Sequence, residues 1–144
     1  MKKLGVLLFT IMLLGGCMSS NAVRVVEDMY RKVMMEDERV EGFFSKQFME
    51  ANAPFDEYKD KLYSDVIERE GVALMHLKEL SKNQMNTSLV EELDLSDGDH
   101  WHFVVAQVDD DHVMLWVVQR GERQYTIVDG KEMHVDEYRN YILD

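Results

Sequence analysis

Residues 101–108 (WHFVVAQV) and 112–119 (HVMLWVVQ) decide the fold, because both runs are rich in β-branched and aromatic side chains. Three consecutive aspartates lie between the runs and predict a loop. A third run, residues 123–128, follows a glycine turn and ends before Asp129-Gly130. Together the runs predict an antiparallel meander of at least three strands.

The alternation of side chains predicts two apolar faces for this sheet. If two-residue turns set the register, one face carries Phe103, Val105, Met114, Trp116, Val118, Tyr125 and Ile127, and the other carries Val104, Ala106, Val108, Val113, Leu115, Val117 and Val128. An open antiparallel sheet usually leaves one face in contact with water. The second face must therefore meet helices, a ligand cavity or another subunit.

Three segments ahead of the strands have apolar residues at three- and four-residue spacing, which is typical of amphipathic helices. They are residues 22–35, 39–51 and 55–68. Pro54 separates the last two, since proline ends one helix and suits the start of the next.

The remaining segments are shorter. Residues 72–80 fit a helix or a strand equally, residues 89–95 predict an early strand, and Asp136 is expected to cap a final helix over residues 137–143. The order of elements predicts the α+β class, with N-terminal helices packed on a C-terminal antiparallel sheet and a short helix at the end.

The first 16 residues have the three parts of a secretory signal peptide. Lys2 and Lys3 form a basic start, residues 4–14 are apolar and uncharged, and Gly15-Gly16 form a small-residue end. At about 1.5 Å per residue the apolar run would span roughly 17 Å, well short of the roughly 30 Å of a bilayer core. We therefore expect cleavage of this segment rather than a retained transmembrane helix.

The sequence Leu14-Gly15-Gly16-Cys17 resembles the lipobox of bacterial lipoprotein precursors. The resemblance implies that diacylglycerol is attached to Cys17, that residues 1–16 are removed and that the new amino terminus is acylated. Residues 17–21 would then tether the domain to a membrane of the bacterial cell envelope. By the same resemblance, Met18 after the cysteine favours the periplasmic face of the outer membrane in a Gram-negative cell.

Length, cysteine content and charge bound what the mature chain can be. Residues 22–144 suffice for one domain, and the single cysteine, Cys17, excludes an internal disulfide. Residues 1–16 contain two lysines and no acidic residue, so the mature chain has 14 Lys+Arg, 28 Asp+Glu and a formal charge of −14. Such an acidic chain disfavours binding to nucleic acid and leaves the lipid as the expected membrane contact.

No motif assigns a catalytic residue, a metal ligand or a cofactor. The chain lacks Gly-x-Ser-x-Gly, His-Glu-x-x-His and a glycine-rich phosphate loop. His100 and His102 would point to the same side of a strand, as a metal pair requires, with Asp97, Asp99 or residues 109–111 as oxygen donors. Solvated turns explain the same aspartates without a metal.

The order of helices followed by a curved sheet is similar to the cystatin-like or nuclear-transport-factor-2-like α+β arrangement of many small lipoproteins. This resemblance implies a cone-shaped pocket or a sheet-mediated homodimer, with Trp101, Phe103, Trp116 and Tyr125 as candidate lining residues.

Two hypotheses about function follow. The first is a non-enzymatic, lipid-anchored domain that binds a protein partner or a small apolar ligand through its sheet. The alternative is a small hydrolase or isomerase that uses a His–carboxylate pair in a sheet pocket.

Overall fold

The structure, a computed structural model, describes residues 20–98 and 100–143. The predicted signal peptide (residues 1–16), the predicted lipidation residue Cys17 and the predicted tether up to residue 19 lie outside the described residues. The α+β prediction is confirmed, because helices occupy the N-terminal part and an antiparallel four-stranded sheet occupies the C-terminal part, followed by a short helix. No helix in the described part of the chain is both long and apolar enough to cross a membrane.

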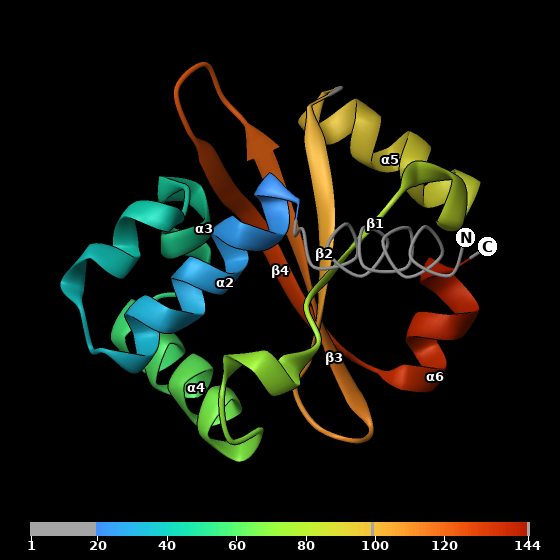
Figure 1. Cartoon of the computed structure of the whole chain (residues 1–144). Coiled ribbons are helices and arrows are strands. Elements are labelled where there is room, and N and C mark those ends of the chain that lie inside the picture. The colour runs from blue at the N-terminus through green and yellow to red at the C-terminus, as the bar shows by residue number, and fades with distance from the viewer. Residues whose placement is uncertain (1–19, 99, 144) are drawn as a thin grey trace, which may run out of the picture.

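The helices cover the two faces of the sheet from opposite sides, α2, α3 and α4 on one face and α5 and α6 on the other (Figure 1). The helical elements are α2 (Asn21–Met34), η1 (Glu38–Phe43), α3 (Lys46–Ala51), α4 (Phe55–Glu68), η2 (Val72–Met75), η3 (Lys82–Gln84), α5 (Thr87–Asp97), α6 (Val135–Glu137) and η4 (Tyr138–Ile142). The strands are β1 (Lys78–Leu80), β2 (Trp101–Gln107), β3 (His112–Arg120) and β4 (Tyr125–His134), paired in the order β1-β2-β3-β4.

The predicted register of β2 is wrong by one residue, so its side chains lie on the opposite faces of the sheet from those predicted. Gln107 pairs with Val113, and a three-residue aspartate loop rather than a two-residue turn joins the strands. A register shift of one residue moves every side chain of a strand to the opposite face. Consequently Phe103 and Trp116, which the sequence placed on one face, lie on opposite faces of the sheet.

Both faces are apolar, as predicted, and both are buried. The face under α2 and α4 carries Val104, Ala106, Val108, Met114, Trp116, Val118 and Ile127. The face under α5 and η4 carries Trp101, Phe103, Val105, Val113, Leu115, Val117 and Met133. The sequence allowed helices, a ligand cavity or another subunit to cover the second face of the sheet, and helices cover it.

The second predicted helix, residues 39–51, is interrupted. Phe44 has extended backbone angles and forms a parallel bridge with Ile127, and the Ser45 N–H donates to the Ile127 carbonyl over 2.9 Å. The Ser45 hydroxyl then accepts from the Phe48 N–H and caps α3. Pairing with β4 therefore outweighs the helical pattern of this segment.

The predicted early strand over residues 89–95 is instead part of α5. The Asn86 side chain accepts from the Ser88 N–H at the start of this helix, and Leu93 is buried against the sheet. Leu89 and Val90 pack on the same core at helical spacing from Leu93. A short apolar run fits both the helical and the strand spacing of apolar residues, and here the Asn86 cap favours the helix.

Strand β4 runs past Asp129-Gly130, where the sequence predicted its end. Val117 pairs with Asp129 and Val118 with Ile127, so one extra residue of β4 forms a bulge. Gly130 pairs with Trp116 inside the strand, and a Cβ atom there would lie 2.5 Å from Cζ3 of that indole. Glycine is needed at this position because the tryptophan ring lies against the backbone.

The last helix begins earlier than predicted. The His134 side chain, rather than Asp136, caps it by accepting from the Asp136 N–H, and a π-helical turn follows from Tyr138. The Ile142 carbonyl accepts from the Asn86 N–H over 2.7 Å, which attaches the C-terminal segment to the start of α5.

Candidate functional site

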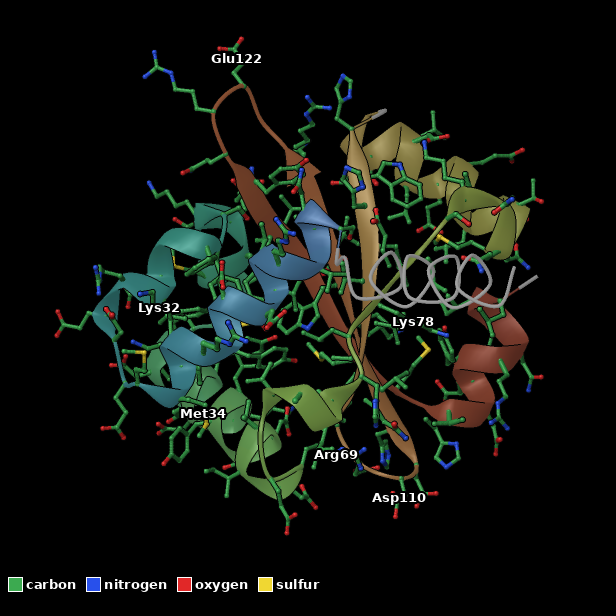
Figure 2. All side chains as sticks on the ribbon, viewed as in Figure 1. Lys32, Met34, Arg69, Lys78, Asp110 and Glu122 are labelled. Carbon is green, nitrogen blue, oxygen red and sulfur yellow. The ribbon has the colours of Figure 1, made fainter. Side chains whose placement is uncertain are left out.

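A cleft opens where β1 and β2 separate. Their last register pair is Leu80 and Phe103, after which β1 leads into η3 while β2 extends further to its first residue, Trp101. The cleft has a volume of about 290 Å³ and is lined by Glu79, Leu80, Ser81, Lys82, His100, Trp101, His102 and Arg120. We call it the histidine cleft. Arg120 ends β3 just before the hairpin loop that carries Glu122 at its tip (Figure 2), so the cleft lies toward this end of the sheet.

The lining of the cleft combines buried apolar side chains with exposed polar ones. Leu80 and Trp101 are only 5% and 4% exposed, whereas Lys82, His100 and Arg120 are exposed. The Arg120 backbone N–H donates to the His100 carbonyl over 2.7 Å, which places these two residues side by side across neighbouring strands.

His102 and Glu79 form a His–carboxylate pair in this cleft. Nδ1 of His102 lies 2.5 Å from Oε1 of Glu79, and both side chains are half-buried. A carboxylate only accepts, so the imidazole donates through Nδ1 and keeps Nε2 for another partner. The sequence analysis named His100 and His102 but missed Glu79. Glu79 lies in residues 72–80, which fit a helix and a strand equally well, so its partner could not be predicted.

Asp94 of α5 holds the side of the cleft together. Its carboxylate accepts the indole N–H of Trp101 over 2.8 Å and the ammonium of Lys82 over 3.0 Å. These two donors hold the pKa of the Asp94 carboxyl below its ordinary value. Lys82 also lies 4.8 Å from the centroid of the Trp101 ring, in a cation–π contact.

Among the residues that the structure describes, Ser81 supplies the one hydroxyl of the cleft lining, and this hydroxyl is engaged elsewhere. The Ser81 hydroxyl lies 2.5 Å from Oδ1 of Asn83 and 2.9 Å from Oε1 of Gln84, and Oε1 of Gln84 also accepts from the Ser81 backbone N–H over 3.0 Å in the capping box of η3. A nucleophilic serine needs a base within hydrogen-bond reach. The hydrogen bonds of Ser81 therefore do not form a serine–histidine pair.

The four predicted lining residues do not come together. Trp101 lines the cleft, Phe103 lies in the core beneath α5, and Trp116 lies fully buried in the core beneath α2. Tyr125 is half-buried, with its ring centroid 5.8 Å from that of His102. A binding role for these four residues stays a prediction, and Trp101 is the one that faces a cleft.

A second hollow, of about 250 Å³, lies between the C-terminal end of α2, η1 and α4. Its lining includes Asp37, Asp56 and Lys59, which already take part in ion pairs: Asp37 with Arg39 over 2.7 Å, and Lys59 with Asp56 over 2.9 Å. Within the described part of the chain, the lining of this hollow contains no histidine, cysteine, serine or threonine. The histidine cleft therefore holds the more reactive combination of side chains.

The opposite end of the sheet carries a second pair of histidines. His112 and His134 are register partners on β3 and β4, with ring centroids 5.4 Å apart. This end also holds the Asp110 loop, where Arg69 lies 3.6 Å from the Asp110 carboxylate (Figure 2). Asp109 accepts from Nδ1 of His112 over 3.0 Å, and this hydrogen bond raises the pKa of the imidazole.

We expect His112 to keep its proton to a higher pH than an ordinary histidine. Because its folded-state pKa is raised, its contribution to stability is present below the unfolded pKa of about 6.5 and is lost as pH rises through the folded value. Histidine NMR titration of wild type and Asp109→Asn measures this, and the variant should lower the pKa of His112. Asp136→Asn, which changes a carboxylate 3.5 Å from His134, is the matched control. An unchanged His112 pKa in Asp109→Asn would contradict the assignment.

No three histidine, cysteine or acidic side chains in residues 20–98 and 100–143 are grouped so as to hold a metal ion. Asp99, an oxygen donor considered from the sequence, lies outside the described residues.

The fold and the cleft define an α+β domain whose four-stranded sheet is covered by helices on both faces and carries a His–carboxylate cleft at one end. The chain matches no known family model, no curated protein and no solved structure.

Proposed function

We propose that this chain is a lipid-anchored protein of the bacterial cell envelope whose domain binds, without catalysis, a small apolar ligand or a segment of a protein partner. The lipobox-like sequence ending at Cys17 supports the anchor. The observation that carries the binding role is the histidine cleft, whose lining combines the buried apolar side chains of Leu80 and Trp101 with exposed polar ones. Binding would use the end of the sheet rather than its faces, since helices cover both.

Membrane fractionation of bacteria that express the full chain tests the anchor. The protein should sediment with membranes, resist a high-salt wash and dissolve only in detergent, because acyl chains rather than charges hold it. Release by salt alone, or a soluble protein, would contradict the proposal.

An enzyme is the second candidate, because His102 and Glu79 form a hydrogen-bonded pair in a cleft. A histidine acting as general base contributes about 10²–10⁴-fold to a rate. The non-enzymatic proposal predicts that wild type and His102→Gln hydrolyse p-nitrophenyl acetate at equal, slow rates.

The matched control is His76→Asn, which changes an exposed histidine with φ 48°, a left-handed conformation that asparagine adopts readily. A loss of about 100-fold in His102→Gln but not in His76→Asn would favour the hydrolase and contradict the non-enzymatic function.

A further inference from the structure

We infer that the domain rests on the membrane by one end of its sheet, with Arg120 and Arg123 of the β3–β4 hairpin against the phosphates of anionic lipids. We call residues 120–124 the basic hairpin. The inference rests on the proposed lipid anchor at Cys17. It adds the surface of the domain that meets the membrane and the side chains that orient it there.

The predicted tether is too short to leave the orientation of the domain free. Four residue steps lead from Cys17 to Asn21, the first residue of α2, and an extended chain covers at most about 14 Å over them. The nine residues of β3 alone span roughly 30 Å. The part of the domain that meets the lipid headgroups must therefore lie near the start of α2.

The start of α2 lies toward the basic hairpin. This helix begins on the half of the sheet nearer the hairpin and runs toward the other half (Figure 1). Glu122 of the hairpin and Asp110 of the β2–β3 loop mark the two ends of the sheet (Figure 2). The tether therefore brings the hairpin end to the membrane. The histidine cleft lies toward the same end, so a ligand would reach it from the membrane side.

The two ends of the sheet differ in the sign of their charge. The basic hairpin has two arginines and one acidic residue, Glu122, whereas the loop of residues 109–111 is three aspartates. Anionic lipids attract cations and repel acidic groups within a Debye length of about 8–10 Å. The membrane would thus attract the hairpin and repel the aspartate loop, although the chain as a whole is acidic.

Arg120 and Arg123 are available to bind phosphate. Both residues are exposed, and neither forms an ion pair with an acidic side chain among residues 20–98 and 100–143. Arg24, in the first turn of α2, is exposed and unpaired in the same part of the chain. A guanidinium matches a phosphate through two parallel hydrogen bonds, and here no ion pair has to break first. The cations that do form ion pairs with acidic side chains are Arg31, Lys32, Arg39, Lys59, Lys61, Arg69 and Lys82.

The cysteine content of the chain allows a direct test of orientation. Cys17 is the sole cysteine and would be acylated, so an introduced cysteine can be labelled alone. Glu122→Cys and Asp110→Cys place a bimane dye at opposite ends of the sheet, and each removes one negative charge.

We would add the full-length lipidated protein to vesicles of phosphatidylethanolamine and phosphatidylglycerol that contain a lipid with a nitroxide on its headgroup. The nitroxide quenches only a dye close to the headgroups. Time-resolved fluorescence then gives the ratio of quenched to unquenched dye at each position.

The dye at position 122 should be mostly quenched and the dye at position 110 mostly unquenched. Each arginine near an anionic surface contributes roughly fivefold to the ratio, so Arg120→Gln with Arg123→Gln should lower it about 30-fold at position 122. Lys131→Gln with Arg139→Gln is the matched control, because it removes two exposed cations outside the hairpin and should leave the ratio unchanged. Vesicles of phosphatidylcholine alone should lower the ratio of the otherwise unchanged protein, since they carry no net surface charge.

Equal quenching at both positions, or stronger quenching at position 110, would overturn the inference. A ratio unchanged by the two arginine substitutions or by phosphatidylcholine would also overturn it. Flotation of the vesicles tests the anchor in the same samples. Protein that floats but is quenched equally at both ends is anchored without this orientation, whereas protein that does not float contradicts the proposed anchor itself.

Discussion

Replacing Cys17 with serine should abolish acylation and leave the precursor uncleaved. Lipid attachment needs the thiol, and serine offers only a hydroxyl of similar size. Each buried methylene of an acyl chain contributes about 0.8 kcal/mol, so two or three chains anchor a protein stably whereas a single one is marginal. The uncleaved chain has a formal charge of −12, which offers no electrostatic substitute for the lost lipid.

Metabolic labelling with an alkyne fatty acid, followed by fractionation and gel electrophoresis, measures both effects. The wild type should be labelled and pelleted, and Cys17→Ser should be unlabelled and larger by the uncleaved residues 1–16. Ser19→Ala, two positions further along the tether, is the matched control and should behave as wild type. Labelling and size unchanged in Cys17→Ser would show that the sequence before Cys17 has been misinterpreted.

The structure of a segment can be predicted from the sequence when local contacts determine it, and cannot when contacts with distant residues determine it. The helix over residues 55–68 and the strands around Val104 and Trp116 were predicted closely, because their periodicity is long and consistent. The face of β2 was not, since a three-residue loop in place of a two-residue turn inverts it. The break at Phe44 depends on Ile127, some 80 positions away in the sequence, and no local pattern contains it.

The candidate site shows the same division. The spacing of His100 and His102 predicts that both point to one side of a strand. Both line the cleft, but His100 precedes β2 and only His102 lies in the strand. The cleft around them needs Glu79 and Lys82 from the β1–η3 segment and Arg120 from the end of β3. These residues meet only through the pairing of three strands, and β1 was not distinguishable from a helix in the sequence. The set of side chains that line the cleft therefore could not be predicted without the order and pairing of the strands.

Trp116→Ala should destabilise the domain by about 3–5 kcal/mol, the usual cost of removing a fully buried large aromatic side chain. The indole is 0% exposed and donates its N–H to the Tyr30 hydroxyl over 3.1 Å. Its ring centroid lies 6.1 Å from that of Phe44 and 6.2 Å from that of Phe48. Gly130, which packs against the indole ring, has no side chain to move into the space. Since domains have only about 5–15 kcal/mol of stability, a large fraction of it would be lost.

Chemical denaturation followed by circular dichroism gives the free energy of unfolding, and two variants divide the effect of Trp116 into its parts. Tyr30→Phe removes only the hydroxyl and leaves the buried indole N–H without a partner, which should cost about 1–3 kcal/mol. Tyr141→Ala, which removes a side chain that is 70% exposed, should change stability by less than about 0.5 kcal/mol. Indole added to Trp116→Ala should restore part of the loss, because an apolar cavity in the native state alone binds such a ligand. A loss below about 1 kcal/mol in Trp116→Ala would contradict the described packing of α2 and α3 on this face of the sheet. A tryptophan that is fully buried between helices and sheet should cost more than that to remove.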